Sequence, residues 1–136
     1  MNKLLGLLVL ILSTSCIQAQ DVWENYFQDS RVKVEFRYTD CHDVVNGIHQ
    51  QKILLRFLNL TNSSIEVSYQ RKPDYGEGYT YETNLQHISL GANAVIEGSC
   101  SEKDKSLFFF SRHLNKQGRS LHRFELANIQ TKIVID

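Results

Sequence analysis

Apolar and charged residues alternate along much of this chain. From Arg31 to Tyr38, every even-numbered residue is apolar and every odd-numbered residue is charged. Side chains of a strand point alternately to opposite faces, whereas a helix needs apolar residues three or four positions apart. The segment is therefore predicted to be a strand with its even positions turned inward. These positions are Val32, Val34, Phe36 and Tyr38.

A second apolar segment follows between residues 53 and 58, with apolar side chains on both faces. A strand of this kind is covered on both sides and lies centrally in its sheet. After a turn at residues 61–63, the alternation resumes over 65–70. We expect the strands on either side of this turn to pair as a hairpin.

The remaining pattern predicts further short strands and one short helical turn, the latter over residues 22–27. The further strands are expected at 79–83, 87–90, 94–99, 107–112 and from 121 onward, with a break near Asn128. About seven or eight strands without a helical stripe predict an all-β fold, specifically an immunoglobulin-like antiparallel β-sandwich. The cysteine and tryptophan order of true immunoglobulin domains is missing, because Trp23 precedes both Cys41 and Cys100.

The first residues have the order of a bacterial signal peptide. Lys3 precedes an apolar run from Leu4 to Leu12, and a small-polar stretch ends at Ala19. The run is much shorter than the roughly 20 residues that a membrane-spanning helix needs. We therefore expect a signal peptide over residues 1–19 and a single β-sandwich domain over 20–136.

An alternative leader ends four residues earlier, at Ser15. Cys16 directly follows Leu12-Ser13-Thr14-Ser15, which resembles a bacterial lipobox except that Ser13 stands where a leucine is usual. Residues 1–15 would then be removed, and the lipidated Cys16 would hold the domain on a membrane surface. In both cases the mature chain is extracytoplasmic, and it contacts a membrane only in the lipidated form.

Two cysteines remain once Cys16 is assigned to the leader or to lipid. In an oxidising compartment, Cys41 and Cys100 are expected to form a disulfide. By closing the loop between them, the disulfide would stabilise the fold by roughly 4 kcal/mol at most in the chain-entropy model. Two separate buried thiols are the alternative.

Charge and motifs exclude several classes of function. The chain has 15 basic and 15 acidic residues, which argues against nucleic-acid binding. No nucleophile elbow, zinc-protease helix or phosphate loop is present, so we expect no enzyme activity and no cofactor. Asp40, His42 and Asp43 could supply part of a metal shell. Adjacent residues rarely converge on one ion, however, and turn formation explains them equally well, so no metal site is predicted.

The segment from Ser111 to Phe124 contains basic but no acidic residues. If residues 107–112 and 121–126 pair as a hairpin, the cations gather at one end of the domain. Guanidinium groups bind carboxylates and sulfates with two parallel hydrogen bonds, so this end is a candidate site for an acidic glycan. The alternative is a solvated loop that protects a sheet edge from pairing. The candidate cations are Arg112, Lys116, Arg119 and Arg123.

A second candidate surface lies in the tyrosine-rich loop near Gly76 and Gly78. Tyr69, Tyr79 and Tyr81 have the parity of inward-facing strand residues, which leaves Tyr75 as the loop residue. An exposed tyrosine offers a large apolar surface for binding sugars or proteins. Whether this loop and the basic segment share one end of the domain stays open at this point.

The sequence favours an exported, non-catalytic binding module of the bacterial cell envelope or exterior. The expected ligand is an acidic glycan or another envelope protein, bound by loops at the ends of the sandwich. The alternative is a structural or assembly component of the envelope, which pairs through an edge strand or is anchored through Cys16.

Overall fold

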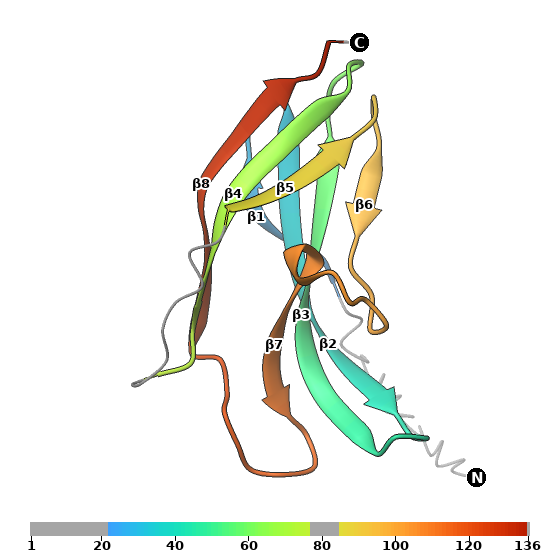
Figure 1. Cartoon of the computed structure of the whole chain (residues 1–136), viewed down its shortest axis with the longest axis vertical. Coiled ribbons are helices and arrows are strands. Elements are labelled where there is room, and N and C mark those ends of the chain that lie inside the picture. The colour runs from blue at the N-terminus through green and yellow to red at the C-terminus, as the bar shows by residue number, and fades with distance from the viewer. Residues whose placement is uncertain (1–21, 77–84, 136) are drawn as a thin grey trace, which may run out of the picture.

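The computed structural model describes residues 22–76 and 85–135 (Figure 1). The predicted leader, Cys16 and the predicted strand at 79–83, with Tyr79 and Tyr81, lie outside the described residues. The part of the chain that the structure describes contains no helix long and apolar enough to cross a membrane.

Within these ranges the fold is all-β, as predicted, and its strands form two antiparallel sheets. In the larger sheet, β1, β2 and β3 are neighbours in that order, and β6 and β7 both pair with β3. In the smaller sheet, β4 lies between β5 and β8. The strands are β1 (Glu24–Gln28), β2 (Val32–Asp43), β3 (Ile48–Asn59), β4 (Ile65–Asp74), β5 (Leu85–Leu90), β6 (Val95–Glu97), β7 (Phe108–His113) and β8 (Arg123–Ile133), with a 3-10 turn η1 (Lys105–Leu107) before β7.

The two sheets contribute to one hydrophobic core. Val34 and Phe57 of the larger sheet and Val67 and Tyr69 of the smaller sheet are fully buried in the same cluster. The rings of Phe57 and Tyr69 stack with their centroids 5.4 Å apart. The Tyr69 hydroxyl donates to the main-chain oxygen of Ser106, and burial raises the pKa of this phenol. Contacts between the sheets therefore provide the core that the alternation predicted.

Burial along β2 follows the predicted parity at Val32 and Val34 but not at the odd-numbered Glu35 and Cys41, which are both 5% exposed. Val32 and Val34 are fully buried, whereas Tyr38 is 47% exposed. The central position predicted for β3 is confirmed, because it pairs with β2 on one side and with β6 and β7 on the other. The predicted break at Asn128 is also present, since this residue has a φ of 54° and the pairing of β4 with β8 shifts beside it.

Both predicted hairpins are wrong. Strands β3 and β4 belong to different sheets, and the short connection between them crosses from one to the other. Likewise β7 pairs with β3, whereas β8 pairs with β4. Residues 114–122 therefore cross between the sheets, and we call them the basic crossover. Alternation fixes which face of a strand is buried, but it does not fix the partner of the strand.

Two local predictions are also wrong. Residues 22–27 contain no helical turn, because β1 begins at Glu24 and pairs with β2. The segment from Asp40 to Asp43 is not a turn but the end of β2. The turn follows at residues 44–47, where Gly47 adopts a φ of 65° that disfavours a side chain.

Candidate functional site

Tyr75 and the basic crossover lie at the same end of the molecule. Tyr75 follows β4, and its hydroxyl donates to the main-chain oxygen of Phe110 in β7 at 2.8 Å. The guanidinium of Arg119 lies 4.3 Å from the centroid of the Tyr75 ring. The end of β4 and the basic crossover both lie in the lower half of the view in Figure 1.

Tyr75 is half-buried and does not form an open stacking platform. Its hydroxyl is engaged by Phe110, and the Arg119 guanidinium covers its ring. A guanidinium that packs on an aromatic ring gains a cation–π contact and loses freedom of rotation. The role of Tyr75 in this geometry is therefore to orient Arg119.

Asp74, the last residue of β4, binds the end of the basic crossover that leads into β8. Its carboxylate accepts from the main-chain nitrogen of Gly76 and from Nε of Arg123, both at 2.9 Å. These bonds, the Gly76 bond above all, hold the pKa of Asp74 below its ordinary value. The main-chain nitrogen of His122 also donates to the Asp74 main-chain oxygen at 2.8 Å. Two consecutive residues of the chain are thereby fixed to the smaller sheet.

Gly76 is required at this point. Its φ is 94°, and a Cβ atom there would lie 3.0 Å from the imidazole of His122. A side chain would therefore be strained by the backbone and crowded by the ring. The glycine lets the loop after β4 approach the basic crossover closely.

The basic crossover is also tied to the larger sheet. The main-chain nitrogen of Leu114 donates to the main-chain oxygen of His49 in β3 at 2.9 Å. The main-chain nitrogen of Leu121 donates to the main-chain oxygen of Ser111 in β7 at 2.7 Å. Main-chain bonds on both sides thus hold a segment that bears several cations.

The charges at this end are of one sign over a long stretch. No acidic residue occurs between Lys105 and Phe124, and Asp74 is the carboxylate that pairs with Arg123. All four predicted cations are exposed: Arg112, Lys116, Arg119 and Arg123. The structure thus places Arg119 on Tyr75 in the loop after β4, and Arg123 on Asp74 at the end of β4.

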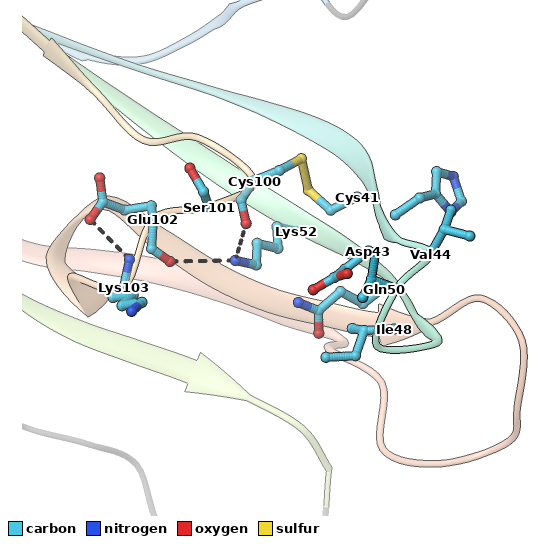
Figure 2. A pocket seen from close by; sticks show the side chains of 12 residues that line it. Cys41, Asp43, Val44, Ile48, Gln50, Lys52, Cys100, Ser101, Glu102 and Lys103 are labelled. Carbon is cyan, nitrogen blue, oxygen red and sulfur yellow. Dashed lines mark hydrogen bonds between the residues drawn. A yellow bond between two sulfur atoms is a disulfide. The ribbon is translucent and has the colours of Figure 1, made fainter.

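The predicted disulfide joins Cys41 to Cys100, with an S–S distance of 2.02 Å and a Cα–Cα distance of 5.4 Å. It forms part of the wall of an open pocket of about 600 Å³ (Figure 2). A disulfide is consistent with an extracytoplasmic, oxidising location. None of the predicted binding residues lines this pocket.

Lys52 is a buried lysine in the pocket that sequence reasoning missed. Its Nζ donates to the main-chain oxygen of Cys100 at 2.9 Å and lies 4.2 Å from the centroid of the Phe108 ring. Burial lowers the pKa of Lys52, and the nearby Glu102 only partly offsets this effect. As Figure 2 shows, Lys52 points toward the chain at Cys100 and Glu102. We interpret it as the anchor of that segment on β3.

The pairing of two histidines at the end of the β2–β3 hairpin was also missed, although the sequence singled out His42. His42 and His49 face each other across the strands, with their Nδ1 atoms 2.8 Å apart. The signal was present in the sequence, because Asn46-Gly47 between them is a typical hairpin turn. Among the residues that the structure describes, no three His, Cys, Asp or Glu side chains form a group that could hold a metal ion.

Comparison with protein-family models, with curated proteins and with solved structures gave no match.

Proposed function

We propose that this chain is an exported, non-catalytic binding module of the bacterial cell envelope or exterior, and that its ligand is an acidic glycan. The binding surface is the end of the molecule formed by Tyr75 and the basic residues from Arg112 to Arg123. The observation that supports it most is the placement of Arg119 on the Tyr75 ring and of Arg123 on Asp74. These contacts hold two guanidinium groups in place before a ligand arrives, which lowers the entropic cost of binding.

The chemistry of this surface favours a polyanion with flat or tetrahedral acidic groups. Guanidinium groups match the geometry of carboxylates and sulfates, and a polymer presents several such groups in sequence. Because the chain as a whole has equal numbers of acidic and basic residues, the attraction is local to this end. We therefore propose that the protein recognises a patterned acidic ligand and does not bind polyanions in general.

The export and architecture proposed here rest on further observations. A signal peptide over residues 1–19 accounts for the apolar start of the sequence, and the disulfide agrees with an oxidising compartment. We also propose that the two sheets form an immunoglobulin-like sandwich. The shared core and the crossings from β3 to β4 and from β7 to β8 support this arrangement.

Binding of polygalacturonate, an acidic glycan, tests the proposal, with neutral dextran as the control ligand. The double variant Arg112→Gln/Lys116→Gln removes two exposed charges and leaves the contacts of Arg119 with Tyr75 and of Arg123 with Asp74 in place. We expect it to weaken binding at least about tenfold, or 1.4 kcal/mol. Arg119→Ala, which removes the cation on Tyr75, is expected to have a similar effect. Added salt should weaken the binding of polygalacturonate to the parent protein more than its binding to either variant.

Lys132→Gln is the matched control, because Lys132 is an exposed cation at the opposite end of β8. It should leave the affinity unchanged. Equal losses for the control and for the basic-crossover variants, or no binding of polygalacturonate above that of dextran, would contradict the proposal. Unfolding midpoints of all variants establish that they remain folded.

The alternative function, a structural or assembly component of the envelope, has its own supporting observation. Apolar residues at the end of the edge strand β8 and just after it are exposed, with Ile133 and Val134 at 42% and Ile135 at 91%. Exposed apolar groups beside an unpaired strand edge favour pairing with another chain. This alternative predicts self-association of the native protein or acyl chains on Cys16, which light scattering and intact mass would show.

A further inference from the structure

We propose that the His42–His49 pair is a binding site for a divalent transition-metal ion, with Cu²⁺ as the preferred ion. The site would use Nδ1 of both imidazoles, and water would fill the remaining positions. This inference goes beyond the proposed glycan binding and does not depend on it.

The separation of the two nitrogens carries the argument. The two Nδ1 atoms are 2.8 Å apart, and the ring centroids are 5.1 Å apart. With metal–nitrogen bonds of about 2.0–2.1 Å, two ligands at a right angle lie about 2.9 Å apart, and two at a tetrahedral angle about 3.3 Å apart. The pair thus nearly has the spacing of neighbouring ligands in a square-planar or tetragonal site. Cu²⁺ prefers this geometry and binds nitrogen ligands more tightly than its neighbours in the series.

The backbone on both sides of the pair is fixed. His42 and His49 are directly opposite in the register of β2 and β3. The Asp43 carboxylate closes the turn by accepting from the main-chain nitrogen of Asn46 at 3.2 Å and from its side-chain nitrogen at 2.7 Å. On the other side, the main-chain oxygen of His49 accepts from Leu114. The metal would therefore meet two ligands that are already close to their bound positions.

The protonation states balance without a co-reactant. In the metal-free pair, one neutral ring donates its Nδ1 proton to Nδ1 of the other ring. On binding, the donating ring exchanges to the tautomer that carries its proton on Nε2, so that both Nδ1 lone pairs reach the ion. Two neutral imidazoles then bind one Cu²⁺ with no net loss of a proton.

The charges around the pair are mixed, because Lys52 and Lys103 line the same pocket as His42 and Arg112 pairs with Gln51 of β3. From Tyr38 to Gln51 the chain contains no lysine or arginine, but it contains Asp40 and Asp43. Asp40 shares the strand face of His42, because the two residues are two positions apart, and its Oδ1 accepts from Gln51 at 3.1 Å. His42 is exposed and His49 half-buried, so an ion and its waters can reach both.

The test is titration of the untagged, oxidised protein with Cu²⁺, followed by electron paramagnetic resonance and calorimetry. We expect one Cu²⁺ at this site, with hyperfine coupling to two imidazole nitrogens. His42→Gln and His49→Gln should each remove one coupled nitrogen and weaken binding at least about tenfold, because even changes outside the ligand shell cost 10–100-fold. Ni²⁺ and Zn²⁺ should bind the parent protein more weakly than Cu²⁺.

His87→Gln is the matched control, since His87 is exposed on β5 of the other sheet and pairs with Glu66. It should leave the Cu²⁺ affinity and the resonance spectrum unchanged. The proposal is overturned if His42→Gln and His49→Gln retain the parent affinity within about twofold. If the parent protein binds Zn²⁺ more tightly than Cu²⁺, the proposed right-angled arrangement of the two nitrogens is wrong. Unfolding midpoints in the presence of a chelator verify that each variant is folded.

Discussion

At the scale of single residues, Glu35 shows how an alternating pattern can hide a buried charge. It occupies a charged position of the pattern, yet it is only 5% exposed. Its carboxylate accepts from Lys33 Nζ at 2.6 Å and from Arg56 Nε at 2.7 Å. The Arg56 guanidinium in turn lies 4.5 Å from the centroid of the Trp23 ring. The outer face of the larger sheet is therefore covered by its own long side chains.

Replacement of Glu35 by Gln should destabilise the protein by about 1–3 kcal/mol near neutral pH. Glutamine keeps one acceptor oxygen but loses the negative charge, and its NH2 group replaces the oxygen that either Lys33 or Arg56 contacts. Burial by itself would raise the pKa of Glu35, but bonds to Lys33 and Arg56 outweigh it and hold the pKa below 4.5. The stabilisation is therefore fully present above pH 4.5 and is lost as the pH falls through the lower folded-state pKa. Urea unfolding of parent and variant at several pH values measures this difference.

Glu97→Gln is the control for this prediction, because Glu97 approaches the same Arg56, at 3.8 Å, but is half exposed. It should change the free energy of unfolding by less than about 0.5 kcal/mol. An equal cost for both variants, or a cost for Glu35→Gln that does not decrease in acid, would show that burial of the ion pair is not the cause.

At the scale of strands, the sequence predicted positions better than partners. The alternation located β7 to within one residue and the starts of β2 and β4, because a strand with one buried face must repeat every two residues. It missed the last part of β2, from residue 39 to 43, and the first part of β3, from residue 48 to 52. The same pattern could not distinguish a hairpin from a crossing between sheets. That choice depends on the segments that connect the strands. In the connection between β3 and β4, the side chain of Asn59 forms several hydrogen bonds.

Asn59 is 4% exposed and holds the crossing from β3 to β4 together. Its Nδ2 donates to the main-chain oxygens of Ser63 and Gly91, both at 2.8 Å. Its Oδ1 accepts from the main-chain nitrogen of Thr61 at 2.9 Å. One side chain thus links β3, the connection and the loop after β5.

Asn59→Ala should therefore destabilise the protein by about 2–3 kcal/mol, since several main-chain groups lose their partner together. Asn62→Ala is the matched control. Asn62 is exposed and bonds only to the side chain of Asn93, so its loss should cost less than about 0.5 kcal/mol. Thermal or urea unfolding distinguishes the two. Equal stability of both variants would mean that the crossing does not depend on Asn59.

At the scale of the whole molecule, the sequence predicted the all-β class and the disulfide between Cys41 and Cys100. It could not place the loop after β4 next to the basic crossover, since both belong to connections whose paths depend on sheet order. The structure brings Tyr75 and Arg119 into contact, so that the Tyr75 ring packs against the Arg119 guanidinium. The His42–His49 pair escaped notice for a similar reason, because the two residues meet only when the turn between them is placed.

The central claim is that a ligand with acidic groups binds at the end of the molecule that holds Tyr75, Arg119 and Arg123. The most direct test is a titration of the isotope-labelled protein with an oligogalacturonate, followed through its amide resonances. We predict saturable shifts concentrated in residues 74–76 and 110–123. Shifts centred instead on the pocket beside Cys41–Cys100 or on residues 132–135, or no shifts at saturating concentration, would contradict the account.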